Sequence, residues 1–213
     1  MSGRRPWTIG DHEARWNGYL IAPDSPVLRN LVHATTVEAL SAAEDDLVEF
    51  RLAELRERPA LVPRTYDLGH LRALHHQLFQ DVYEWAGELR TVGLAKGSGD
   101  SFMPPMQIER PMAHATARIA DADLLRSVPA DDLPTEVAYL YDYVNFAHPF
   151  REGNGRSQRE FFAQLLAESG HGLEWDRIEM SDLHHACHVA RNDDDLAPLT
   201  RIVEQALTES PSY

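Results

Sequence analysis

The chain has 213 residues, 43% of them hydrophobic, which is enough for one well-packed domain and excludes a disordered segment. Its net charge of −14 argues against a protein that binds DNA or RNA through a basic surface. The sequence shows no signal peptide and no run of apolar residues long enough to span a membrane, and its one cysteine, Cys187, allows no intramolecular disulfide. These features favour a cytoplasmic protein.

The first half of the chain predicts two long helices. Residues 37–56 carry apolar residues at helical spacing, so a helix is expected there with its inward positions at Leu40, Leu47, Phe50 and Leu55. Asp67 is a good helix cap, and the apolar spacing after it predicts a helix that runs to about Trp85 and ends at Gly87.

The pattern then changes from helical to extended. Residues 88–95 are typical of a strand, residues 96–100 of a Gly-rich turn and residues 101–103 of a short return strand, which together predict a β-hairpin. Further helices are expected near residues 107–124, 134–147, 156–169, 181–191 and 196–208. The chain is therefore predicted to be all-α with one small hairpin. Residues 31–208 should form a single domain, preceded by an extension at 1–30 and followed by a polar tail at 209–213.

The segment from His148 to Arg159 carries the chemistry. It brings together a possible base, His148, an acidic residue, Glu152, and the turn Gly153-Asn154-Gly155. Apolar pairs after this turn predict that a helix begins near Arg156, and the N–H groups of a helix N-terminus favour an anion. Arg156 and Arg159 share one face of that helix. Because cations at a helix N-terminus are unfavourably placed, the two arginines indicate a phosphate site, although pairing with surface acids would also explain them.

This segment resembles the Fic signature His-x-Phe-x-(Asp/Glu)-Gly-Asn-Gly-Arg-x-x-Arg, and it matches every defined position. The resemblance extends to residues 82–92 and to Lys96-Gly97-Ser98, which are similar to the segment that leads into the flap of Fic proteins. It implies a Fic-type helical bundle with the hairpin as a flap beside the active site. It also implies transfer of AMP from ATP to a Tyr, Thr or Ser hydroxyl of a target protein, with release of pyrophosphate.

The resemblance assigns a role to each residue of the signature. His148 would be the general base, since an imidazole is largely neutral near pH 7. Glu152 would hold Mg²⁺, which commonly takes one carboxylate together with phosphates and waters. Gly153, Asn154 and Gly155 would cradle the phosphates, Arg156 would steady the phosphate chain, and Arg159 would bind the γ-phosphate. Related Doc kinases carry Lys where this chain has Gly155, so the glycine favours AMP transfer over phosphorylation.

The resemblance also suggests partners. Lys96, Gly97 and Phe102 of the flap would position the target by strand addition. Many Fic enzymes are restrained by a helix with the pattern (Ser/Thr)-x-x-x-Glu-(Gly/Asn). Only Thr200 to Gln205 comes near this pattern, with Glu204 in place but Gln at the end. We therefore expect a small antitoxin to supply the inhibitory glutamate, which would make this chain the toxin of a toxin–antitoxin pair. Similar short Fic toxins suggest a bacterial type II topoisomerase as the target.

Several alternatives stay open at this stage. The same fold could use another donor, such as UMP or phosphocholine, or could remove AMP, and a non-catalytic module could bind a nucleotide or a partner protein. His184 and His188 stand one helical turn apart near Cys187, a spacing that can bind zinc, but the sequence shows no further ligand.

Overall fold

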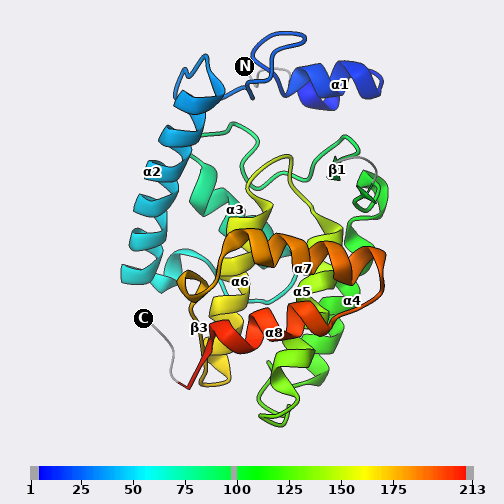
Figure 1. The fold of residues 1–213 in the computed structure, drawn as a ribbon. Coiled ribbons are helices and arrows are strands. Elements are labelled where there is room, and N and C mark those ends of the chain that lie inside the picture. Colours follow the sequence, from blue (N-terminus) through cyan, green and yellow to red (C-terminus); the bar gives the residue numbers. More distant parts are fainter. Residues whose placement is uncertain (1–4, 97–99, 210–213) are drawn as a thin grey trace.

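In the computed structural model, which describes residues 5–96 and 100–209, the chain is mainly helical (Figure 1). The eight α-helices of the described residues are α1 His12–Gly18, α2 Val37–Glu57, α3 Leu68–Phe79, α4 Glu109–Asp121, α5 Leu133–Ala147, α6 Asn154–Glu168, α7 Met180–Asn192 and α8 Ala197–Ala206. Short 3₁₀ turns lie at Pro6–Thr8, Pro59–Leu61, Pro105–Gln107 and Trp175–Arg177. The predicted all-α class is confirmed, and α4 to α8 match their predicted ranges to within a few residues.

Helix α2 forms where the sequence predicts it, capped by the side chain of Thr36, which accepts a hydrogen bond from the Ala39 N–H at 3.2 Å. Its buried positions are Leu40, Glu44, Val48 and Leu55. The inward position predicted for Phe50 is wrong, because its side chain is 60% exposed and lies off this stripe.

Helix α3 begins as predicted, since the Asp67 carboxylate accepts from the His70 N–H at 2.8 Å. It ends at Phe79, and the predicted extension to Trp85 is wrong. A contact far along the chain explains the early end. The carbonyl of Val82 accepts from the Leu31 N–H at 2.8 Å, so it is engaged outside the helix.

The hairpin is shorter than predicted. Strands β1 (Ala95–Lys96) and β2 (Asp100–Ser101) pair antiparallel, and the N–H of Phe102 donates to Leu94 O at 3.0 Å. The strand predicted at residues 88–94 does not form, because Arg90 donates its backbone N–H to Pro149 O at 2.8 Å instead of pairing with the return strand. A second two-stranded sheet, which the sequence did not predict, joins β3 (Gly172–Leu173) to β4 (Leu207–Thr208).

The apolar core has two parts. The larger part lies among the helices from α3 to α8, with α5 and α6 at its centre. In the smaller part the N-terminal segment packs on the chain that follows α3: Trp7 and Tyr19 lie against Val82 and Trp85, and the rings of Tyr19 and Trp85 meet edge to face at 5.8 Å. The loop between α5 and α6 contacts both parts, since its Phe150 belongs to the larger part and its Gly153 lies against Phe79 of the smaller part.

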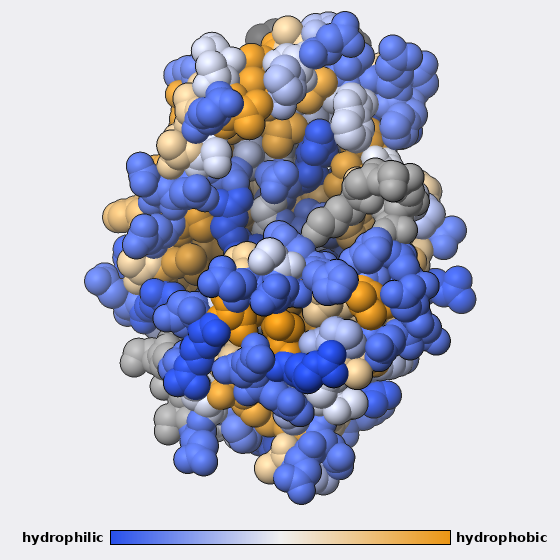
Figure 2. All heavy atoms as spheres, in the orientation of Figure 1, coloured by the Kyte–Doolittle hydropathy of each residue, from blue (hydrophilic) through white to orange (hydrophobic). Residues whose placement is uncertain are grey.

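Hydrophilic residues cover most of the face shown in Figure 2, as the high net charge leads one to expect. Among the described helices, none is long and apolar enough to cross a lipid bilayer.

The pKa values of two buried histidines predict how the stability of the fold depends on pH. Burial lowers the pKa of His70 to about 4 and that of His75 to about 3. Between these values and the unfolded pKa near 6.5, the unfolded chain binds more protons than the native state. The free energy of unfolding should therefore fall as the pH falls, by roughly 2 kcal/mol per histidine between pH 8 and pH 5. Urea unfolding at the two pH values measures this change.

The control is a pair of matched variants. In His70→Gln, the decrease in the free energy of unfolding that these two histidines cause between pH 8 and pH 5 should be about half as large. In His185→Gln, where the replaced histidine is exposed, the decrease should be as large as in the wild type. An unaltered pH dependence in His70→Gln would show that this histidine is not the source.

Candidate active site

The loop between α5 and α6 begins at His148 and ends at Gly153. His148 stops α5 because its backbone is left-handed, with φ of 40°. Gly153 is also left-handed, with φ of 78°, and a Cβ there would lie 2.4 Å from Cζ of Phe79. Glycine is thus required at this position both by its conformation and by the close approach of a buried ring.

Asn154 braces this loop from inside. Its side-chain oxygen accepts from the Phe150 N–H at 2.8 Å, and its amide nitrogen donates to the Phe150 carbonyl at 2.8 Å. The Ser157 hydroxyl adds a bond to Gly153 O at 3.1 Å. The amide of Asn154 is therefore engaged in holding the shape of the loop, which in turn presents the N–H groups at the start of α6.

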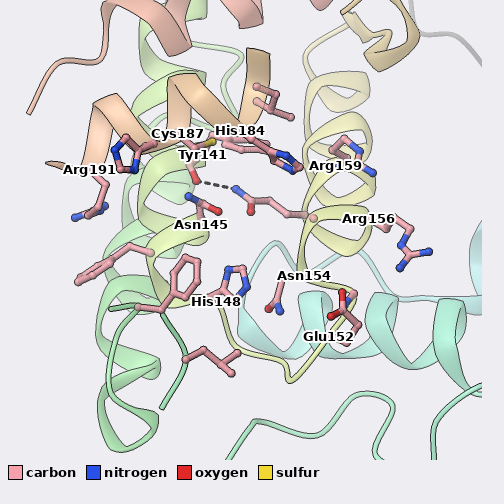
Figure 3. Close-up of a pocket in the computed structure, with 18 of the residues that line it drawn as sticks. Tyr141, Asn145, His148, Glu152, Asn154, Arg156, Arg159, His184, Cys187 and Arg191 are labelled. Atoms are coloured by element: carbon pink, nitrogen blue, oxygen red, sulfur yellow. Dashed lines mark hydrogen bonds between the residues drawn. The ribbon is translucent and has the colours of Figure 1, made fainter. Parts of the chain in front are cut away.

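The N-terminus of α6 opens into a cavity of about 540 Å³. All residues of the signature that were assigned a role line this cavity (Figure 3). They are His148, Glu152, Gly153, Asn154, Gly155, Arg156 and Arg159. A volume of this size is typical of a small-molecule site. The structure thus brings together the signature residues, and the open N–H groups of a helix N-terminus make this end of the cavity suitable for an anion.

The two signature arginines have different surroundings. Arg156 forms ion pairs with Glu44 and, at 3.0 Å, with Asp45, both from α2, and its guanidinium lies over the ring of Phe79. Burial and the neighbouring charge of Arg159 lower its pKa to about 10. Arg159 is half-buried and pairs with no carboxylate among the described residues. Arg159 is therefore the more available cation for a ligand in the cavity.

Glu152 is exposed at the rim of the cavity. One of its carboxylate oxygens accepts from the Gly153 N–H at 3.0 Å, and its backbone carbonyl accepts from Nε2 of His75 at 2.9 Å. A single exposed carboxylate beside a helix N-terminus fits Mg²⁺, which takes its remaining ligands from phosphates and water. The residues present thus fit the ion that the sequence predicts.

His148 lies at the boundary between the cavity and the flap. Its imidazole stacks on the ring of Phe102, with ring centroids 3.6 Å apart and an angle of 11° between the planes. Phe102 and Ser101 line the cavity together with Leu94 and Ala95 from the opposite arm of the flap. Gly97 and the side chain of Lys96 lie outside the described residues, so of the predicted flap residues only Phe102 can be placed.

Helix α7 forms the far wall of the cavity, which the sequence did not reveal. Its lining residues are Met180, Leu183, His184, Cys187 and His188, and Figure 3 shows Cys187 beside Tyr141 of α5. Within the described part of the chain, no three His, Cys, Asp or Glu side chains form a cluster that could hold a metal ion.

Further residues near the site were also missed. Glu44 pairs with Arg156 across the cavity rim, and Arg151 places its guanidinium 4.5 Å from the ring of Trp16 in α1. Arg90 and His75 bind the loop itself. The only signal for Arg90 was its place in the flap-like segment, and nothing in the pattern around Glu44 or His75 distinguishes either residue from an ordinary helical position.

The comparisons with known proteins agree with this geometry. A sequence model described as the Fic/DOC family matches residues 65–166. Protein adenylyltransferase VbhT of Bartonella schoenbuchensis is 35% identical over 77% of this chain and 34% of its own length. Probable protein adenylyltransferase y4lH of Sinorhizobium fredii is 33% identical over 88% of this chain and 95% of its own length. The chain thus spans about a third of the first relative and nearly all of the second.

A solved structure shares the fold. The BepC protein of Bartonella tribocorum, solved with bound AMPPNP, superposes with a TM-score of 0.81 at 21% identity. The match covers 92% of this chain and 98% of that one.

Proposed function

This chain belongs to the Fic/DOC family, and we propose that it is a protein adenylyltransferase that moves AMP from ATP to a Tyr, Thr or Ser hydroxyl of a target protein. The names of the similar proteins support this reaction. The observation that supports the proposal is the cavity itself, which is lined by His148, by Glu152 and by the first residues of α6.

Phosphate binding follows from the start of α6. The Gly153 N–H donates to the Glu152 carboxylate, but the N–H groups that follow it at the start of α6 have no helical acceptor and favour an anion. Arg159 adds a positive charge with no carboxylate partner among the described residues, and we assign it to the γ-phosphate. Arg156, already paired with Glu44, steadies this end of the cavity next to the phosphate chain. Asn154 contributes by shaping the cradle.

The transfer step requires a base at the target hydroxyl. His148 accepts the hydroxyl proton while the oxygen forms a bond to the α-phosphorus, and the bond from that phosphorus to the β-phosphate oxygen breaks, releasing pyrophosphate. The stacked ring of Phe102 holds the imidazole at the edge of the flap, where an incoming target segment would lie.

Glu152 is the residue that would hold Mg²⁺. Held there, the ion would supply positive charge against the phosphates during the transfer. The hydrogen bond from the Gly153 N–H orients the carboxylate, and that from His75 fixes the backbone of Glu152.

We also infer that inhibition comes from a separate antitoxin, as in a toxin–antitoxin pair. Helix α8 buries Leu199, Ile202 and Val203 in the core, whereas Glu204 is exposed and is not among the residues that line the cavity. This arrangement supports a structural role for α8 and disfavours Glu204 as a built-in inhibitor. A type II topoisomerase remains the proposed target class.

The test is incubation of the purified chain with Mg²⁺, a bacterial lysate and ATP labelled at the α-phosphate. We expect a labelled protein band that is absent when the label is at the γ-phosphate. A band with γ-labelled ATP would instead indicate a kinase. Labelling only with UTP or a phosphocholine donor would show that the fold is right and the proposed donor is wrong.

A further inference from the structure

Arg90 lies in the chain between α3 and the flap, and its side chain connects three segments of the active site. The residue is 2% exposed. Its Nε donates to His148 O at 2.7 Å and one terminal nitrogen donates to Val92 O at 2.7 Å. The other terminal nitrogen donates to Met103 O and, at 3.4 Å, to Ala147 O. One guanidinium thus contacts both arms of the flap and the backbone of the proposed base.

The chemistry of these contacts is specific to arginine. All four acceptors are backbone carbonyls, and no described carboxylate pairs with Arg90. Burial accordingly lowers its pKa to about 10. A buried cation held only by dipoles costs free energy, and only the planar fork of a guanidinium can reach carbonyls in several directions at once. An apolar residue in its place would leave these carbonyls without the donor that Arg90 supplies.

His75 makes the matching connection at the other end of the loop. This buried imidazole accepts from the Gly87 N–H through Nδ1 at 2.8 Å and donates through Nε2 to Glu152 O at 2.9 Å. It also stacks on Phe150, with ring centroids 3.8 Å apart. Because the Gly87 N–H can only donate, the proton of His75 must be on Nε2. Both ends of the loop are therefore bound to the same short segment, residues 87–92.

The arm of the flap that follows the hairpin turn contacts the end of α5 and the imidazole of His148. The N–H of Met103 donates to Phe146 O at 3.0 Å, and Phe102, its neighbour, stacks on the imidazole of His148. A displacement of the flap would therefore be transmitted to the base through Phe102, and to its backbone through Arg90.

We propose that Arg90 and His75 are positioning residues that lock the flap and the catalytic loop into one rigid frame. A target segment bound along the flap would then present its hydroxyl at a fixed distance from His148. The role assigned to this frame rests on the proposed function, whereas its rigidity is a property of the free protein. Since a misplacement of about 1 Å can cost roughly 100-fold in rate, a rigid frame has a direct catalytic value.

The test of the frame uses amide hydrogen exchange in the wild-type protein and needs no activity. The N–H groups of Arg90 and Met103, which bond to Pro149 O and Phe146 O, should exchange as slowly as those in the middle of α5. In Arg90→Lys both should exchange faster and together. Fast exchange of either group in the wild type, or a response of only one group in the variant, would overturn the proposal.

The catalytic consequence is tested with Arg90→Lys and a matched control. Arg72→Lys is suitable because Arg72 also donates to a carbonyl of this segment, Gly87 O at 2.9 Å, but forms no hydrogen bond with the flap or the loop among the described residues. Arg90→Lys should reduce labelling of lysate protein by α-labelled ATP about 10- to 100-fold and leave the Kd for a non-hydrolysable ATP analogue unchanged. Arg72→Lys should leave both unchanged.

Three outcomes would contradict the positioning role. The two variants could lose transfer equally, or Arg90→Lys could retain full transfer. Analogue binding could also fall in parallel with transfer. Absence of labelling in the wild type would instead contradict the proposed function. The exchange experiment would then still test whether Arg90 connects the flap and the loop rigidly.

Discussion

His148→Ala is expected to reduce AMP transfer by about 10²- to 10⁴-fold, the usual contribution of a general base, and to leave the affinity for an ATP analogue unchanged. The imidazole lines the cavity next to the flap, whereas the proposed phosphate contacts come from the start of α6. Transfer is measured with α-labelled ATP and analogue binding by equilibrium titration. The two readouts separate loss of the base from loss of the cavity.

His184→Ala is the matched control, because His184 is a second histidine on the wall of the same cavity but lies on α7. We expect it to retain the transfer step. If His148→Ala labels the target at the wild-type rate, or if both variants lose transfer equally, His148 is not the base.

Glu44→Ala is expected to have the largest effect on stability. Glu44 is 6% exposed, and its carboxylate is shared between the guanidinium of Arg156 and the hydroxyl of Tyr83. Removal of one partner from a buried ion pair costs about 3–5 kcal/mol, and the remaining pair with Asp45 should keep the loss near the lower end of that range. Urea unfolding at pH 8 measures the change.

Two further variants test the cause of this loss. Glu44→Gln keeps one acceptor oxygen for Arg156, and its amide N–H can donate to the Tyr83 hydroxyl, so it should cost about half as much. Glu204→Ala removes an exposed carboxylate from α8 and should change the free energy of unfolding by less than about 0.5 kcal/mol. Equal losses in Glu44→Ala and Glu204→Ala would show that the contact with Arg156 does not stabilise the fold.

The ion pair also has a consequence for the site. Arg156 was predicted to steady the phosphate chain, and in the structure its charge already has two acidic partners. Removal of Glu44 would release this charge toward the cavity. The stability measurement is therefore best accompanied by the analogue titration, since a tighter complex would show that Glu44 competes with the phosphates for Arg156.

The sequence by itself determined the features that depend on neighbours in the chain. Helix α2 follows from apolar spacing, the start of α3 from the capping carboxylate of Asp67, and the start of α6 from the glycines around Asn154. Each of these depends on backbone conformation and side chains within a few residues, so a local pattern contains the necessary information.

Local patterns failed where a distant contact decided the outcome. Helix α3 stops at Phe79 because the carbonyl of Val82 bonds to Leu31, and residues 88–94 form no strand because Arg90 bonds to the loop after α5. In both cases the local preference was overruled by a hydrogen bond to a partner that the spacing of nearby residues cannot identify.

Only the tertiary structure decided how the site is held together. Glu44 and Arg156 are 112 residues apart in the chain, Arg90 and His148 are 58 apart, and the wall formed by α7 joins residues from two further helices. Such pairs form only when packed helices bring their faces into contact, and the energy of a buried charge depends on that packing. The sequence therefore predicted the residues of the candidate site, and the packing of the helices determined which other residues contact them.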